Sequence, residues 1–338
     1  MLLFLSSPFL QAGSNMAAEN VTSIQEFILV GLTSHRKTQI LLFGVVLLIY
    51  VATVFGNLMI ILLVQVDSHL HIPMYFFLTN LATLEICYVT STLPQALAHL
   101  LNGNGAISVT CCMLQMDVAL TLGSTECLLL SAMAYDRYLA ICHPLLYATA
   151  MDKGRQLQLA SACWTIAFLL SLITVYFTFR HPFCGPNRIS HFICELPVVL
   201  KLACADTCVT EALVSGLAVF VALVPLSVIL LSYILIFNSV LHMRSNARRH
   251  KAFSTCSSHL LVVVLFYGCV IAMYVVPRSG PVPDRDKHVA VFYFLVTPLL
   301  NPIIYSFRNK DVHTALTKVL KRRPFGVRVV EPCLHPIL

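Results

Sequence analysis

Seven long apolar runs constrain the fold of this chain more than any other feature of its sequence. They cover residues 39–65, 74–97, 111–139, 157–179, 212–237, 255–276 and 289–307. A helix that crosses a bilayer needs roughly 20 mostly apolar residues, whereas a membrane-spanning strand needs only about 10. Backbone groups in lipid must also be hydrogen-bonded within a helix or a closed barrel. The sequence therefore predicts an all-α protein, a bundle of seven transmembrane helices.

The composition agrees with a lipid environment. Hydrophobic residues make up 58% of the 338 residues and charged residues only 11%, against about 25% charged in an ordinary soluble domain. The net charge is +7, but the basic residues stand at the ends of apolar runs and form no separate basic domain. This distribution argues against nucleic acid as a partner. The chain also contains no GxxxxGK, HExxH or CxxC pattern, which argues against the common phosphate-loop and zinc sites.

The positions of lysine and arginine predict the orientation. If the N-terminus is outside, 14 of the 22 lysines and arginines lie on the inner side, and inner loops usually carry the excess. Asn20 begins an Asn-Val-Thr glycosylation acceptor, which is useful only on the outer side. We therefore expect an extracellular segment at residues 1–38, the seven-helix domain at 39–307, and a cytoplasmic amphipathic helix and tail at 308–338.

Four motifs stand on four of the runs. PMYFFL opens the second run at Pro73, and MAYDRYLAICHPL closes the third from Met133. KAFSTCSSHL opens the sixth at Lys251, and PLLNPIIYSFRN closes the seventh from Pro298. In this order and on these runs, the motifs resemble those of the olfactory receptors, which are rhodopsin-like G-protein-coupled receptors. The resemblance extends from about residue 20 to residue 323. The long second outer loop, with three cysteines, is similar to the tetrapod-type class.

The resemblance implies a function. It predicts a non-enzymatic receptor in the plasma membrane that binds small volatile odorants, activates a stimulatory heterotrimeric G protein and raises cyclic AMP. A chemoreceptor of the same fold acting outside the olfactory epithelium is an alternative, because the sequence does not encode the tissue. A membrane transporter is a more distant alternative, since no internal repeat is visible. A membrane enzyme would need a nucleophile and a base, and His259 has no partner at motif spacing.

Asp136, Arg137 and Tyr138 form a charged motif at the inner end of the third run. Arginine keeps its charge in a protein, so Arg137 needs a partner, and Asp136 is adjacent. The resemblance implies that Arg137 faces the G protein when the receptor opens, while Tyr233 and Tyr305 rearrange around it. An ordinary helix-end pair directed toward the headgroups would look the same in the sequence.

Two acids, Glu85 and Glu126, lie deep in apolar runs, where no lysine or arginine can reach them. A charge at that depth costs about 3 kcal/mol or more. Either both carboxyl groups are neutral, which burial favours, or they share a cation. The resemblance implies a sodium ion, with Asn57 and Asn301 nearby. Pro302 follows Asn301 inside the seventh run and predicts a local hinge, because proline interrupts helical hydrogen bonding.

The outer segments contain a set of six cysteines: Cys111, Cys112, Cys184, Cys194, Cys204 and Cys208. Disulfides persist on the outer side of a cell, but six cysteines can pair in many ways. The resemblance implies that Cys112 pairs with Cys194 and that Cys184 pairs with Cys204. Alternatively, some of these cysteines could hold a metal ion together with His181 and His191.

The ligand site is expected between the outer halves of the third, fifth, sixth and seventh runs. Its predicted lining is Ala119, Leu120, Gly123, Ser124, Leu217, Ala218, Val221, Tyr267, Val270, Ile271, Tyr274 and Phe294. A mostly apolar lining with a few hydroxyl groups suits a neutral, largely apolar ligand. We expect Ser124, Tyr267 or Tyr274 to donate a hydrogen bond to it. This set contains no acid like the one that amine receptors place near Ala119.

A short amphipathic helix is expected after the seventh run. Apolar side chains recur there at helical spacing among basic ones: Val312, Ala315, Leu316, Val319 and Leu320. Such a helix would lie on the inner leaflet of the membrane.

Overall fold

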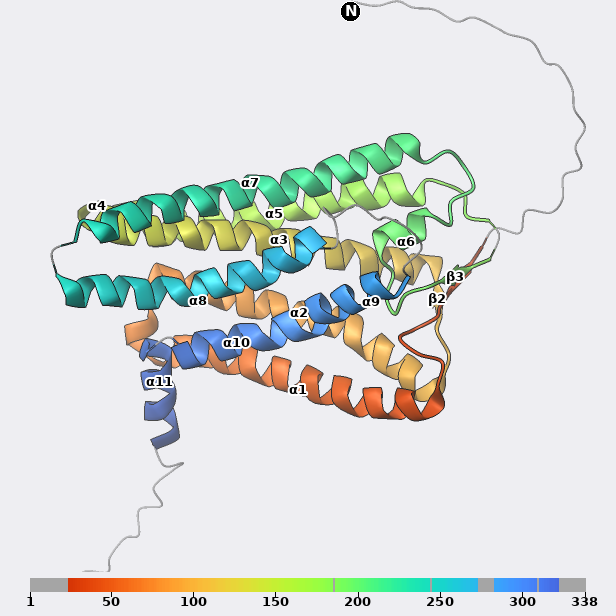
Figure 1. Ribbon diagram of the computed structural model, residues 1–338, viewed down its shortest axis with the longest axis horizontal. Coiled ribbons are helices and arrows are strands. Elements are labelled where there is room, and N and C mark those ends of the chain that lie inside the picture. Colours follow the sequence, from red (N-terminus) through yellow and green to blue (C-terminus); the bar gives the residue numbers. More distant parts are fainter. Residues whose placement is uncertain (1–23, 185, 244, 273–282, 309, 322–338) are drawn as a thin grey trace, which may run out of the picture.

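The computed structural model describes residues 24–184, 186–243, 245–272, 283–308 and 310–321. Its long helices lie side by side in one bundle (Figure 1): α1 (Arg36–Val66), α2 (Pro73–Asn102), α3 (Val109–Cys142), α5 (Lys153–Phe179), α7 (Cys208–Leu241) and α8 (Asn246–Val270). The seventh span is composite. It runs through α9 (Pro283–Val291), the π-helix η3 (Phe292–Val296) and α10 (Thr297–Arg308). The predicted seven-helix bundle is therefore confirmed.

The helices match the predicted apolar runs closely. Among the described residues, six helices are long and apolar enough to cross a bilayer, including the composite stretch Lys287–Tyr305. The sixth run corresponds to α8, whose apolar part is Cys256–Val270, and residues 273–276 of that prediction lie outside the described residues. The first span begins at Arg36 rather than at residue 39.

Local sequence explains several helix ends. The Ser108 hydroxyl accepts a hydrogen bond from the Cys111 amide at the start of α3, and Asp152 accepts one from Arg155 at the start of α5. Both are N-cap interactions that satisfy an otherwise unbonded amide. Pro73 is the first residue of α2, where it costs no hydrogen bond. Gly103 ends α2 in the left-handed region, with a φ of 71°.

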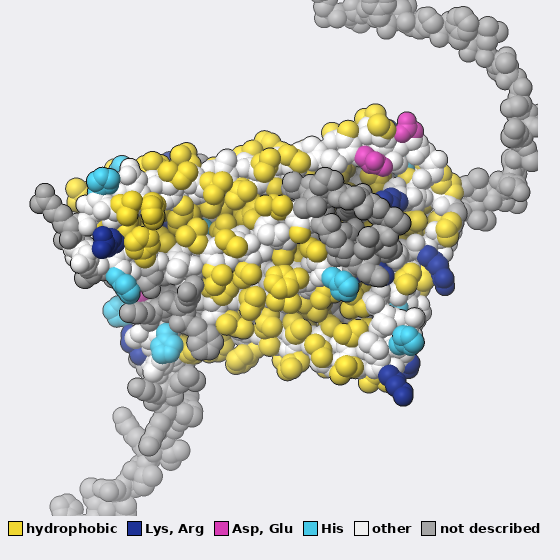
Figure 2. Space-filling view, in the orientation of Figure 1, with side chains coloured by type: hydrophobic (Ala, Val, Ile, Leu, Met, Phe, Trp, Pro, Cys, Tyr) yellow, Lys and Arg dark blue, Asp and Glu magenta, His cyan; other side chains and the backbone are white. Residues whose placement is uncertain are grey.

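The surface of the bundle is apolar around its middle. Figure 2 shows hydrophobic side chains across the centre of the visible face, with charged side chains toward the two ends. On α1, Leu48 is 70% exposed, and on α7, Ile234 is 64% exposed. A soluble monomer does not expose apolar area on this scale, so this surface faces lipid.

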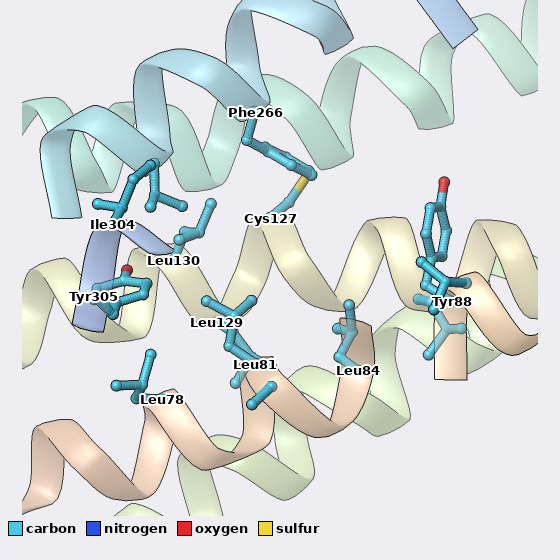
Figure 3. Packing of buried hydrophobic residues seen from close by; sticks show 14 of the residues in the cluster. Leu78, Leu81, Leu84, Tyr88, Cys127, Leu129, Leu130, Phe266, Ile304 and Tyr305 are labelled. Atoms are coloured by element: carbon cyan, nitrogen blue, oxygen red, sulfur yellow. The ribbon is translucent and has the colours of Figure 1, made fainter. Parts of the chain in front are cut away.

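The interior is closed by leucine and aromatic side chains from several helices. Figure 3 shows Leu81 of α2 and Leu129 of α3 pointing toward one another, and Phe266 of α8 lying against Cys127 of α3. Leu78, Leu81 and Leu129 are each no more than 1% exposed. Truncating one such leucine to alanine typically costs about 2–5 kcal/mol.

A small sheet covers the outer end of the bundle, and the all-α prediction did not include it. Its strands, β1 (Glu26–Leu29), β2 (Ala106–Ser108) and β3 (Arg188–Ile189), are arranged in the order β2-β1-β3. The first pair is antiparallel and places Phe27 opposite Ile107. The second pair is parallel and places Ile28 opposite Arg188. Strands of two to four residues are too short to give a recognisable alternation in sequence.

Short helices complete the two ends. The 3-10 helix η1 (Ser68–Leu70) and the helix α4 (Pro144–Ala150) lie in the inner loops, and α6 (Leu196–Leu200) lies in the second outer loop.

The predicted amphipathic helix is α11 (Lys310–Lys321). Its Val312 and Ala315 are buried, while Lys318 is exposed and donates to Asp67 at 3.2 Å. The side chains of Val319 and Leu320 lie outside the described part of the chain.

Candidate functional site

A cavity of about 460 Å³ lies within the outer half of the bundle. Its walls come from α2, α3, α5, α7, α8 and the π-helix, and its ceiling is the loop that leads into α6. Nine of the twelve residues predicted for the ligand site line it: Ala119, Leu120, Gly123, Ser124, Leu217, Ala218, Val221, Val270 and Phe294. The helical spacing of α3 and α7 therefore brings together the residues expected from the sequence.

The other three predicted residues lie elsewhere. Tyr267 is buried, but it packs edge-on against Phe266 in the core and does not line the cavity. Ile271 is 39% exposed and also lies outside the lining. Since Val270 faces the cavity, the next residue points about 100° away around the helix. Tyr274 lies outside the described residues. The expected hydrogen bond from Tyr267 to a ligand is therefore not supported.

An aromatic cluster forms a wall of which the sequence predicted only Phe294. Tyr88 of α2 stacks on Phe294, with ring centroids 5.0 Å apart, and Tyr293 packs against Phe266 at 5.7 Å. Tyr293 and Phe294 are consecutive, yet both line the cavity. They lie in the π-helix, whose wider turn distorts the ordinary helical spacing, and such turns are frequent at functional sites. The apolar pattern alone gave no signal of this turn.

Gly123 makes room for a close approach within the cavity lining. A Cβ atom at this position would lie 2.8 Å from the hydroxyl oxygen of Tyr293. Any larger residue would therefore displace the tyrosine or fill part of the cavity.

The ceiling is held by two disulfides. Cys112 of α3 is bonded to Cys194, and Cys184 is bonded to Cys204 within the loop. These are the pairs that the resemblance implied. Cys111 and Cys208 remain free and exposed. The Cys194 amide also donates to Gln115 of α3 at 2.9 Å, which fixes the loop over the cavity.

The alternative of a metal ion at the outer cysteines finds no support. Among the described residues, no three His, Cys, Asp or Glu side chains gather to hold one. His181 is hydrogen-bonded to Thr210 at 2.8 Å, and His191 is paired with Glu195 at 3.2 Å.

The two deep acids lie together below the cavity. Glu85, Glu126 and Asn301 are each no more than 2% exposed, and the Asn301 amide donates to Glu85. Two buried oxygen atoms of this cluster have no hydrogen-bond partner: Oε1 of Glu126 and Oδ1 of Asn301. The cluster therefore offers unsatisfied oxygen ligands inside the bundle.

Asn57 has a specific structural task beside this cluster. Proline has no amide hydrogen, so Pro302 leaves the carbonyl four residues earlier, that of Pro298, without its helical donor. The Asn57 side chain donates to this carbonyl at 3.4 Å and to the Thr53 carbonyl at 3.0 Å. Asn57 therefore connects α1 to the interrupted helix α10.

At the inner end, Asp136 is bonded to a tyrosine rather than to its neighbour. Tyr147 of α4 donates to Asp136 at 2.8 Å, and Tyr138 is hydrogen-bonded to His143 at 2.9 Å. Within the described part of the chain, no ion pair joins Arg137 to Asp136, contrary to expectation. The short helix α4 brings the tyrosine to the buried carboxyl group, and sequence spacing alone did not reveal this contact.

Tyr233 takes part in a hydrogen-bonded chain across three helices. The ring nitrogen Nε2 of His259 donates to the carbonyl of Leu130 at 3.2 Å, so Nδ1 is free to accept from the Tyr233 hydroxyl at 2.8 Å. These hydrogen bonds join α7, α8 and α3. Their partner in α3, Leu130, precedes Arg137 in the same helix. Tyr305 is buried nearby in the same core, and its hydroxyl has no partner. The sequence gave His259 no partner, because Tyr233 lies on another helix.

Comparisons with known proteins agree with this arrangement. A family model described as "Olfactory receptor" matches residues 46–323. Human olfactory receptor 2G3 is 46% identical over 305 residues, which cover 90% of this chain and 99% of the relative. Human olfactory receptor 2D2 is 47% identical over 303 residues, covering 90% and 98%. Mouse olfactory receptor 2C1 is 44% identical over 305 residues, covering 90% and 98%. The chain therefore belongs to the olfactory receptor family, whose members are multi-pass membrane receptors and not enzymes.

Proposed function

We propose that this receptor binds a small, volatile, largely apolar odorant in the cavity, with its N-terminus outside the cell. The odorant then activates a stimulatory heterotrimeric G protein and raises cyclic AMP. The observation that carries the proposal is the mostly apolar cavity of about 460 Å³, which is large enough for a small ligand. It lies in the outer half of the same bundle whose inner end holds Arg137.

The mechanism is a shift between two states of the bundle. A ligand that binds the open state more tightly than the closed state raises the population of the open state. In this structure, His259 of α8 is bonded to both the Tyr233 hydroxyl and the Leu130 carbonyl. Movement of α8 away from α3 would break the bond to the Leu130 carbonyl. The separated helices would then expose Arg137 to the G protein, and Tyr233 and Tyr305 would be free to rearrange around it.

The interrupted helix α10 would serve as the hinge. Pro302 removes one helical hydrogen bond, and the bond from Asn57 that replaces it comes from another helix. This carbonyl can therefore exchange its donor without unwinding the rest of α10.

A sodium ion fits the acid cluster and would stabilise the closed state. Glu126 and Asn301 each present a buried oxygen without a partner, and Glu85 adds a second carboxyl group. At a concentration tenfold above its Kd, a bound ion would stabilise the protein by about 1.4 kcal/mol. The melting temperature of the purified receptor in sodium chloride should exceed that in choline chloride at equal ionic strength. Glu126→Gln should remove the difference, and a difference that persists would refute the site.

Signalling is tested in cells that express the receptor with an N-terminal tag. We expect a dose-dependent rise in cyclic AMP with at least one member of a broad panel of volatile compounds. Arg137→Ala should reach the surface, as intact-cell staining of the tag reports, and lose the response. Arg155→Ala is the matched control, since it removes the same charge from an exposed inner position bonded only to its own helix. Normal signalling by Arg137→Ala would refute the switch.

A further inference from the structure

The cavity has one charged residue at its ceiling. Among the described residues that line the cavity, Glu195 is the only one with a formal charge at neutral pH. It follows Cys194 directly and is 6% exposed. The remaining lining consists mainly of aliphatic and aromatic side chains with a few hydroxyl groups. A ligand in this cavity therefore meets a carboxyl group at the ceiling and mainly apolar surface elsewhere.

The position of Glu195 is fixed by covalent and hydrogen bonds. Its neighbour Cys194 is bonded to Cys112 and donates to Gln115, which in turn donates to Gln95. On the other side, the Glu195 carbonyl accepts from the amides of Val198 and Val199 at the start of α6. The residue thus belongs to a rigid ceiling and not to a loosely held loop.

The carboxyl group lies beside a buried histidine. The Ile193 amide donates to Nδ1 of His191 at 3.3 Å, so the ring hydrogen is on Nε2. This nitrogen lies 3.2 Å from Oε2 of Glu195. His191 is 1% exposed and stacks on Phe192, with ring centroids 4.7 Å apart. Burial lowers the pKa of His191 to about 4, and the positive charge of Lys287 acts in the same direction. The imidazole is therefore neutral at physiological pH.

We infer that Glu195 determines ligand specificity, and that the cavity prefers an apolar molecule with one hydrogen-bond-donating end, an alcohol or a protonated amine. The inference rests on the proposed function of the cavity. A carboxylate only accepts hydrogen bonds, so it favours a hydroxyl or ammonium group. Aldehydes offer only an acceptor, and carboxylates carry the same charge. A hydrogen bond to a charged group corresponds to about a tenfold or larger difference in affinity.

The inference differs from the sequence-based expectation in a specific way. That expectation gave the cavity donors, from Ser124 and two tyrosines, and no acid. The acid comes instead from the loop, at a point that the disulfide to Cys112 brings over the cavity.

The test uses four straight-chain probes of equal carbon number: octylamine, 1-octanol, octanal and octanoic acid. Binding is measured as the rise in melting temperature of the purified receptor in lipid nanodiscs, which requires no G protein. Cyclic AMP is measured in parallel. The variant is Glu195→Gln. This variant keeps the size of the side chain, removes the negative charge and adds an NH₂ group that can donate a hydrogen bond. The matched control is Glu211→Gln, which removes an exposed acid on the first turn of α7, outside the lining.

The wild type and Glu211→Gln should bind the amine and the alcohol at least about tenfold more tightly than the aldehyde and the acid. Glu195→Gln should lose the preference for the amine and gain affinity for the aldehyde. If Glu195→Gln does not fold, the order of the four probes on the wild type decides alone. A wild type that binds none of them, or binds octanal as tightly as 1-octanol, overturns the inference. So does a folded Glu195→Gln with an unchanged order. Correct binding order with silent cyclic AMP would instead refute only the proposed G-protein coupling.

Discussion

The close contact between β1 and the loop before β2 makes Gly105→Ala a sharp test of the outer cap. A Cβ atom at Gly105 would lie 2.1 Å from the carbonyl oxygen of Leu29, which is backbone and cannot rotate away. It would also lie 2.8 Å from the ring of His99. An ordinary contact begins near 3.4 Å, so the two backbones must separate by about 1.3 Å, the difference between 3.4 and 2.1.

That separation removes a hydrogen bond. The Leu29 amide donates to the Gly105 carbonyl at 2.8 Å, and an added 1.3 Å takes this distance to about 4 Å. The lost bond costs about 1 kcal/mol, and the overpacking costs about 1–3 kcal/mol. The sum, about 2–4 kcal/mol, should lower the melting temperature by roughly 4–8 °C at about 2 °C per kcal/mol.

The protein carries its own reporters for this measurement. Cys127, Cys163, Cys256 and Cys269 are buried and free, so a thiol-specific fluorophore reacts with them only as the bundle opens. Gly44→Ala is the control, because a Cβ atom there would meet nothing within 4 Å. A Gly105→Ala receptor that melts within about 1 °C of the wild type, as Gly44→Ala should, would show that the strand contact contributes nothing.

Three further outcomes are expected. Gly123→Ala should weaken the cyclic AMP response to an active ligand about tenfold while surface staining stays normal, because its Cβ would displace Tyr293; an unchanged dose–response curve would contradict this. Cys194→Ser should stop the receptor from reaching the surface, since it opens the bond that holds the cavity ceiling, and normal surface staining and signalling would show that the bond is dispensable. The wild-type melting temperature should fall as the pH drops from 6.5 toward 4. In this range His191 takes up a proton in the unfolded chain, but not in the folded protein, where burial lowers its pKa to about 4. The free energy of unfolding should therefore fall by about 3 kcal/mol. His191→Gln should flatten this dependence on pH.

The membrane spans could be predicted because lipid leaves the chain few options. A long apolar run must satisfy its own backbone, so length and composition alone locate α1, α3 and α7. The same helical geometry placed Ala119 and Gly123 of α3 on the cavity side. Predictions of this kind depend only on residues within one helix.

The missed features depend on contacts between distant segments. Glu195 faces the cavity because a disulfide between two cysteines that are 82 residues apart in the sequence brings the loop to α3. Tyr233 meets His259, and Asn57 meets the Pro298 carbonyl, across separate helices. Ile271 was misplaced because the boundary between cavity and lipid on α8 depends on its rotation against its neighbours. None of these relations has a local pattern in the sequence.

Two residues of the cavity lining also face the outside of the bundle. Ser215 and Val219 of α7 both line the cavity, and both are exposed, Val219 by 44%. The cavity therefore reaches the exposed surface of α7 at this point. An apolar volatile compound accumulates in the bilayer, so the concentration that the receptor samples there is the membrane concentration and not the aqueous one. Within a homologous series, potency in water should rise with each added methylene until the cavity is full, because each one adds about 0.8 kcal/mol of transfer from water.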